Sequence, residues 1–154
     1  MLIAKICLST GARWSEAEEL QISQVKHEVI EFARTKSGKV RGIPIDKDLG
    51  NEIRAHFKSH GSLMRVFGSA AAAFREGVER SGLVLPDGQL THVLRHSFAS
   101  HFMMGDGARG GNILVLQRLL GHADLKMTMR YAHLAPEHLQ EARTLNPLSR
   151  LTLG

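Results

Sequence analysis

The sequence contains little cysteine, few aromatic residues and no long hydrophobic run. Its one cysteine, Cys7, excludes an internal disulfide framework and a multi-cysteine metal site. Six Phe, one Trp and one Tyr are too few to favour a protein that binds single strands by base stacking. No stretch approaches the roughly 20 apolar residues of a membrane helix, and the apolar N-terminus is too short for a secretory signal. These absences predict a cytoplasmic location.

The charge and overall composition are those of a basic globular chain. Twenty Lys and Arg against 15 Asp and Glu give a net charge of +5, with a pI near 9.8, which favours an anionic partner. Charge is spread evenly along the chain, so residues 1–154 are predicted to form one domain. The first residues are apolar and lack a helix cap, which predicts that the chain begins inside a larger protein.

Hydrophobic periodicity and capping signals predict mostly helices and one hairpin, hence an α+β fold that is mostly helical with a small antiparallel β-sheet. Ser15 with Glu18 resembles a capping box, Asp46, Thr91 and Asn112 resemble N-caps, and Gly11 and Gly121 resemble C-caps. Strands are expected at 28–35 and 40–45, around a turn at Ser37-Gly38. Helices are expected at 2–9, 16–21, 63–80, 92–104, 113–120, 124–132 and 137–144. A further helix is expected after the Asp46 cap, with Leu49, Ile53 and Phe57 at a spacing of four.

Two pattern matches are weak. Gly105, Gly107 and Gly110 fit a dinucleotide-binding string, but a predicted helix precedes them where that motif needs a strand. His92 and His96 have the spacing of a zinc protease, but Val93 stands where the catalytic glutamate belongs.

Other pairs of residues are more informative. His92 and Arg95 share one face at the start of a helix, which suits a phosphate as well as it suits a solvated polar surface. Arg13 lies on a tight turn, where it either binds a ligand or pairs with Glu16. Basic residues in the predicted hairpin either contact a nucleic-acid backbone or keep its tip soluble; they are Arg34, Lys36, Lys39 and Arg41. His122 after a helix end and the lone tyrosine, Tyr131, are each compatible with a purely structural role.

Taken together, these stretches resemble the catalytic domain of the tyrosine recombinase (phage integrase) family, and look most like temperate-phage integrases. The matching segments occur in the family's order and span most of the chain: TGARWSEAEEL at 10–20, TKSGKVRGIPI at 35–45, LTHVLRHSFASHFM at 90–103 and LQRLLGHADLKMTMRYAHL at 116–134. The family's separate N-terminal DNA-binding domains have no counterpart in the sequence.

The resemblance implies a role for each matching residue. Arg13 and Arg95 clamp the scissile phosphate, and Tyr131 is the nucleophile that forms a 3′-phosphotyrosine. Lys36, or alternatively Lys39, protonates the leaving 5′ oxygen. His92 assists proton transfer, and His122 donates a hydrogen bond in the transition state. Lys39 and Arg41 contact DNA.

The resemblance also implies a setting for this chemistry. Double-stranded DNA is the partner, no metal or other cofactor takes part, and the chains work as a tetramer. The C-terminal segment, 134–154, either packs on a neighbouring subunit or folds onto its own domain. Two alternatives stay open from the residues: a DNA-binding regulator without catalysis, and a type IB-like enzyme that relaxes DNA without strand exchange.

Overall fold

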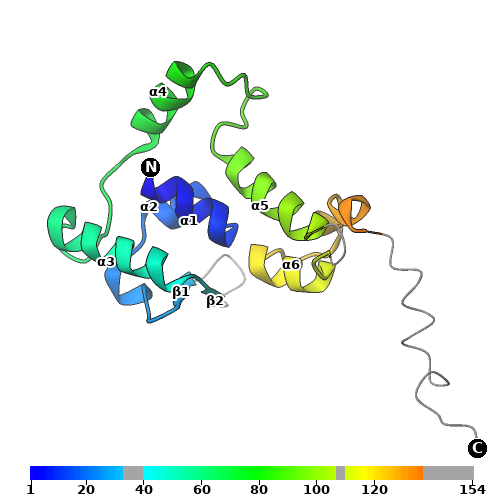
Figure 1. Cartoon of the computed structure of the whole chain (residues 1–154), viewed down its shortest axis with the longest axis horizontal. Coiled ribbons are helices and arrows are strands. Elements are labelled where there is room, and N and C mark those ends of the chain that lie inside the picture. The colour runs from blue at the N-terminus through cyan, green and yellow to red at the C-terminus, as the bar shows by residue number, and fades with distance from the viewer. Residues whose placement is uncertain (33–39, 107–109, 137–154) are drawn as a thin grey trace, which may run out of the picture.

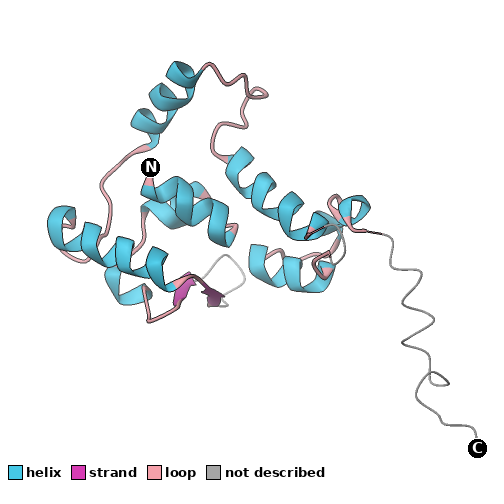
Figure 2. Ribbon diagram, viewed as in Figure 1, coloured by secondary structure: helices cyan, strands magenta, loops and turns pink. Residues whose placement is uncertain are grey.

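The computed structural model describes residues 1–32, 40–106 and 110–136. Its helices and its one hairpin form an α+β fold, as the sequence predicts (Figures 1 and 2). Along the chain, the elements are α1 (Leu2–Thr10), α2 (Trp14–Glu18), η1 (Ile22–Gln24), β1 (Val29–Phe32), β2 (Arg41–Pro44), α3 (Lys47–His60), α4 (Ala71–Ser81), α5 (His92–Met104), α6 (Ile113–Leu120), α7 (Lys126–Met129) and η2 (Ala132–Leu134).

The two strands pair in antiparallel register. Ile30 lies opposite Ile43, and Phe32 lies opposite Arg41, so these four side chains share one face of the hairpin. Ile30, Phe32 and Ile43 are buried, which makes this the inward face. The predicted turn at Ser37-Gly38 lies outside the described residues.

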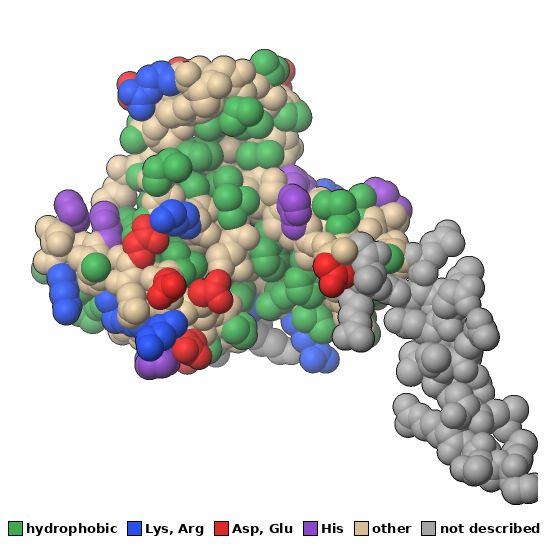
Figure 3. All heavy atoms as spheres, in the orientation of Figure 1, with side chains coloured by type: hydrophobic (Ala, Val, Ile, Leu, Met, Phe, Trp, Pro, Cys, Tyr) green, Lys and Arg blue, Asp and Glu red, His purple; other side chains and the backbone are tan. Residues whose placement is uncertain are grey.

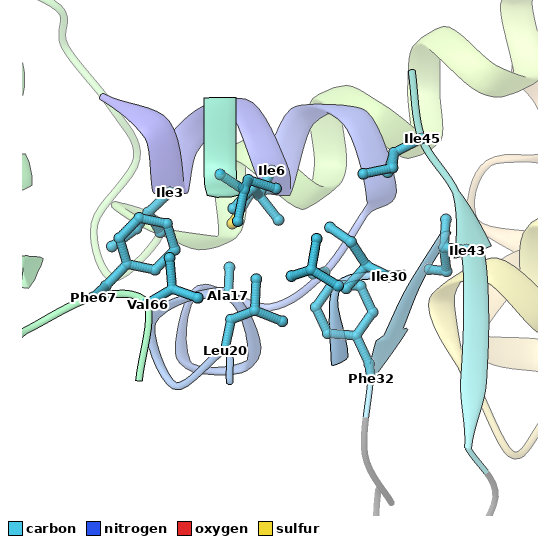
Figure 4. Close-up of a cluster of buried hydrophobic side chains, with 14 of the residues drawn as sticks. Ile3, Ile6, Ala17, Leu20, Ile30, Phe32, Ile43, Ile45, Val66 and Phe67 are labelled. Carbon is cyan, nitrogen blue, oxygen red and sulfur yellow. The ribbon is translucent and has the colours of Figure 1, made fainter. Parts of the chain in front are cut away.

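The main hydrophobic core lies between α1, α2, the hairpin and the chain before α4. Figure 4 shows side chains from all of these segments meeting in one cluster, among them Ile6 of α1, Leu20 after α2, Ile30 of β1 and Val66. Each of these four is fully buried, and burial of such a side chain stabilises the fold by about 1.5–3 kcal/mol. The core fixes α1 and the hairpin relative to each other.

A second, smaller core joins α5 to α6 and to the segment around Tyr131. Its buried members are Ala99, Met103, Leu116, Leu120 and Tyr131. Helix α5 also packs along α1, so it connects the two cores (Figure 1). The candidate site residues lie where these two cores meet.

Two predicted helix starts are wrong. Helix α4 begins at Ala71 rather than at 63, because residues before it pair in extended form: the Val66 backbone N–H donates to Leu20 at 2.9 Å. Helix α2 begins at Trp14, and its capping carboxylate is that of Glu16, which accepts the Arg13 backbone N–H at 2.8 Å. The predicted Ser15–Glu18 capping box is therefore displaced by two residues.

The last third of the described chain follows the predictions more closely. The Asn112 side chain accepts the backbone N–H groups of Leu114 and Val115 and so caps α6. The predicted helix 124–132 is shorter, because α7 ends at Met129 and a 3₁₀ turn, η2, follows Tyr131. The predicted helix 137–144 lies outside the described residues. No helix in the described part of the chain is long and apolar enough to cross a membrane.

Candidate active site

Arg95 lies at the centre of the site and is held by the ends of two helices. Its Nη1 donates to the Gly11 carbonyl at the C-terminus of α1, and its Nη2 donates to the Leu120 carbonyl at the C-terminus of α6, both at 2.7 Å. The side chain is buried, with the residue 8% exposed. Helix C-termini carry partial negative charge, so both contacts stabilise the cation. A guanidinium has five N–H donors, and these two bonds leave three for a ligand.

Both helices that hold Arg95 end in a left-handed glycine. Gly11 has φ 66° and Gly121 has φ 67°, a conformation that costs other residues about 1–2 kcal/mol. Space is also limiting, because a Cβ at Gly121 would lie 2.8 Å from Nη1 of Arg41. The predicted C-caps at these glycines are confirmed, and Arg95 donates to the carbonyl of Gly11 itself and to that of Leu120, the residue before Gly121.

Arg41 points into the molecule from β2. It shares the inward strand face with Ile43, and its guanidinium lies 5.3 Å from the centre of the Phe32 ring. Its Nη1 donates to the Leu120 carbonyl at 2.5 Å, and its Nη2 pairs with Glu16 at 2.9 Å. The side chain is only 10% exposed. Arg41 therefore braces the site from within, whereas the sequence interpretation placed it on the DNA.

Glu16 joins Arg41 to Arg13. Its carboxylate accepts the Arg13 backbone N–H, and it also lies 3.4 Å from Nη1 of Arg13. The Arg13 side chain remains 42% exposed. The ion pair that the sequence suggested is therefore present, and it leaves part of this guanidinium open to a ligand.

The Tyr131 hydroxyl lies against His96 of α5. The Tyr131 oxygen and Nδ1 of His96 are 2.5 Å apart, and Tyr131 is 6% exposed. Burial raises the pKa of Tyr131, while the charges of Arg130 and Arg95 act in the opposite direction. Burial lowers the pKa of His96, helped first by Arg130. At neutral pH the site therefore contains a protonated phenol beside a neutral imidazole.

His122 follows the left-handed Gly121 and turns its Nδ1 towards Thr128 of α7, with 2.9 Å between Nδ1 and Oγ1. Burial lowers the pKa of His122 to about 4, and the charge of Arg95 is the next largest cause. The ring is therefore neutral at neutral pH, and its other nitrogen is not engaged by Thr128. Thr128 is fully buried.

The remaining residues proposed from the sequence fall at the edge of the site or beyond the described residues. His92 is the first residue of α5 and is exposed. Its charge still acts on His96, one turn along the same helix. Lys36 and Lys39 lie outside the described residues.

Positive charge dominates the site. Four arginines lower the pKa of His122: Arg95, Arg13, Arg130 and Arg41. Glu16 is the acidic residue among the described residues of the site. Elsewhere the signs mix: on the face drawn in Figure 3, acidic and basic side chains lie together around α3. The site is thus suited to an anion, and a phosphate would accept hydrogen bonds from its guanidinium groups. No group of three His, Cys, Asp or Glu residues in the described part of the chain is placed to hold a metal ion.

The sequence interpretation missed three residues of the site. His96 was considered only as half of a zinc pair, although it lies next to Arg95 and one helical turn from His92. Thr128 precedes Tyr131 by three residues, a spacing that puts both on one side of a helical turn. Arg130 was not singled out. Alternation along β2 was the signal that would have turned Arg41 inward, because Ile43 and Ile45 lie on the same face.

Comparison with known proteins gives matches that include all the described residues of the site. A family model described as the phage integrase family matches residues 1–138. The integrase of Escherichia phage 186 is 55% identical over 150 residues, which are 97% of this chain and 42% of that protein. The integrase of Haemophilus phage HP1 is 55% identical over 148 residues, which are 96% of this chain and 41% of that protein. The chain thus spans less than half the length of these relatives.

Solved structures of an integrase and of a recombinase have a similar fold. The catalytic domain of bacteriophage HP1 integrase superposes with a TM-score of 0.85 at 52% identity, covering 97% of this chain and 83% of that one. The XerA recombinase, at 24% identity, superposes with a TM-score of 0.69 over 98% of this chain and 58% of that one, which is a likeness of fold alone.

Proposed function

The chain belongs to the phage integrase family, and from this premise we propose that residues 1–154 are the catalytic domain of a tyrosine-type site-specific DNA recombinase. Its reaction is the breakage and rejoining of DNA strands through a 3′-phosphotyrosine. The observation that carries this proposal is the lone tyrosine, held beside a cluster of arginines that converges on Arg95.

The arginines supply the charge that phosphoryl transfer needs. Negative charge develops on the non-bridging oxygens of the phosphodiester in the transition state, and preorganised donors stabilise it where it develops. Arg95 is fixed by two carbonyls rather than by a carboxylate, so its positive charge stays available to the phosphate. The partly exposed Arg13 reaches the phosphate from the solvent side. His122 donates a hydrogen bond to the phosphate from the ring nitrogen that Thr128 does not engage.

Tyr131 provides the covalent step. Its oxygen attacks the phosphorus, and the ester that forms keeps the energy of the broken bond. A 5′ hydroxyl from another strand can then rejoin the backbone without ATP. By the family resemblance, Lys36 or Lys39 protonates the leaving oxygen. The resemblance also implies that His92 assists proton transfer.

The proposal includes the partners and the setting of the reaction. Double-stranded DNA carries the phosphate, and the chain acts on it in the cytoplasm. Tetramers form on DNA through the C-terminal segment 134–154, most of which lies beyond the described residues. The integrase and recombinase relatives support strand exchange over a regulator or a DNA-relaxing enzyme.

Covalent capture tests the nucleophile. The chain is mixed with a pool of nicked duplexes of randomised sequence, and adducts that survive detergent are isolated, sequenced and mapped by peptide mass spectrometry. We expect the DNA to be attached to Tyr131, and the Tyr131→Phe variant to bind duplex normally but form no adduct, because it lacks the attacking oxygen. An adduct that persists in this variant would contradict the assignment. Circular dichroism checks that the variant is folded.

A further inference from the structure

The Tyr131 hydroxyl must lose its proton before it can attack a phosphorus atom. A phenol is a weak nucleophile, and the pKa of Tyr131 is raised by burial, so little phenolate exists at neutral pH. A group that accepts the proton must be within hydrogen-bond reach of the oxygen. Nδ1 of His96 is within that reach.

His96 has the right protonation state to accept this proton. Its pKa lies below the usual 6.5, so the ring is neutral above that lowered value and has one unprotonated nitrogen. The charged and titratable groups that face it are Arg130 after α7, together with His92 and Arg95 on its own helix. In the neutral tautomer that carries its proton on Nε2, the unprotonated Nδ1 of His96 accepts the hydrogen bond that the Tyr131 hydroxyl donates.

His92 is less well placed for this step. It lies one turn earlier on α5, where its side chain is exposed, whereas His96 is partly buried with its ring centre 5.9 Å from that of Tyr131. The two histidines therefore have different surroundings: His92 is exposed to solvent, whereas His96 contacts the nucleophile.

We propose that His96 is the catalytic residue that accepts the Tyr131 proton during strand cleavage, an inference that rests on the proposed recombinase function. The O–H bond of Tyr131 breaks and its proton moves to Nδ1 of His96. The tyrosyl oxygen bonds to phosphorus, the bond from phosphorus to the 5′ oxygen breaks, and that oxygen takes a proton from Lys36 or Lys39, the general acid that the family resemblance implies. In rejoining, His96 returns the proton to the departing tyrosyl oxygen.

The surrounding charges couple this proton transfer to DNA binding. Arg130 and Arg95 oppose a positive charge on His96 in the free protein, which keeps the imidazole neutral. A bound phosphate adds negative charge beside the same arginines and so favours the imidazolium. His96 therefore becomes a stronger proton acceptor when the scissile phosphate is in place.

Replacement by amides separates proton transfer from hydrogen bonding. In His96→Asn and His96→Gln, a carbonyl oxygen can still accept a hydrogen bond from Tyr131 but cannot take up its proton. We expect both variants to bind DNA and to form the covalent adduct about 100-fold more slowly at neutral pH, the scale of losing a general base. Their rates should recover as pH rises, because hydroxide then removes the phenol proton. His101→Asn, at an exposed position of α5, is the matched control and should cleave at the unmodified rate.

The choice of leaving group separates this role from that of a general acid. The substrate is a nicked duplex recovered by covalent capture, prepared with either oxygen or sulfur at the 5′ bridging position. Sulfur departs as a thiolate without protonation, so it rescues the loss of an acid but not the loss of a base. The slow cleavage by the His96 variants should persist with sulfur.

Two results would overturn the assignment of His96: amide variants that cleave within a few-fold of the unmodified chain at neutral pH, or a defect that disappears with the sulfur substrate. Measuring both amides, each checked by circular dichroism, prevents one misfolded variant from deciding the outcome. An unmodified chain that forms no adduct at all would instead contradict the proposed function.

Discussion

Arg95 is a buried cation whose hydrogen bonds go to peptide carbonyls. Burial lowers its pKa to about 10, with Arg13 and Arg41 acting in the same direction, so it remains charged at neutral pH. A carboxylate partner would have neutralised this charge, whereas two helix ends stabilise it and leave it unpaired. The residue is thereby fixed before a ligand arrives, which is what a preorganised transition-state donor requires.

Thr128 performs a comparable task for His122. The Thr128 hydroxyl is fully buried, and His122 is its hydrogen-bond partner among the described side chains. A buried hydroxyl proton without an acceptor is costly, so the hydroxyl donates to Nδ1. The neutral ring then carries its own proton on Nε2, the nitrogen left to donate to a phosphate oxygen.

A pair of substitutions tests this orientation of His122. Thr128→Val keeps the shape of the side chain and removes the hydroxyl, whereas Thr128→Ser keeps the hydroxyl. We expect the valine variant to form the covalent adduct roughly fivefold more slowly, the scale of one hydrogen bond of about 1 kcal/mol, and the serine variant to stay near the original rate. The proton position is read directly from the ¹⁵N shifts of His122. A valine variant that keeps the original rate, with a serine variant that is slower, would mean that Thr128 acts only by packing.

At the scale of elements, the sequence located best those helix termini that a capping residue marks, at their beginnings as well as at their ends. Gly11 and Gly121 end their helices as predicted, because a left-handed C-cap strongly favours glycine. The helix predicted over 63–80 failed in its first part, where Val66 has helical spacing but is buried from an extended segment paired with Leu20. Apolar spacing over a short run does not distinguish a helix from an extended segment. Here the pairing with Leu20, which is distant in the sequence, decided in favour of the extended segment.

The C-cap of α6 can be tested against a matched glycine. Gly82 ends α4 with φ 71° and has open space around its Cβ direction, whereas a Cβ at Gly121 would collide with Arg41. Gly82→Ala should therefore lose only the backbone cost of about 1–2 kcal/mol, and Gly121→Ala should lose more in free energy of unfolding and also slow adduct formation. Urea unfolding and single-turnover cleavage measure the two effects. Equal stability losses with unchanged cleavage would show that Arg41 adapts without disturbing the site.

At the scale of the whole molecule, the residues that belong to motifs were predictable and those that support them were not. Arg13, Arg95, His122 and Tyr131 come from four separate segments, and the fold brings them into one electrostatic neighbourhood. The missing information was orientation. Which histidine of α5 faces the tyrosine depends on how α5 packs against α6 and the segment after α7, and no local pattern encodes that packing.

The concentration of positive charge at this site, rather than the net charge of +5, should govern DNA binding. A protein that replaces counterions with arginines loses affinity as salt rises, with a slope near −0.9 in log K against log salt for each phosphate contacted. We expect Arg13→Ala to reduce the steepness of that slope by about one contact, because the Arg13 side chain is 42% exposed and lies beside the buried Arg95. Lys5→Ala removes the same charge from a residue that is paired with Glu52 on α3, and should leave the slope unchanged.

Fluorescence anisotropy of a short labelled duplex across a salt series measures the slope for both variants. Equal changes in the two variants would mean that overall charge, and not the arginine cluster, draws the DNA to the protein.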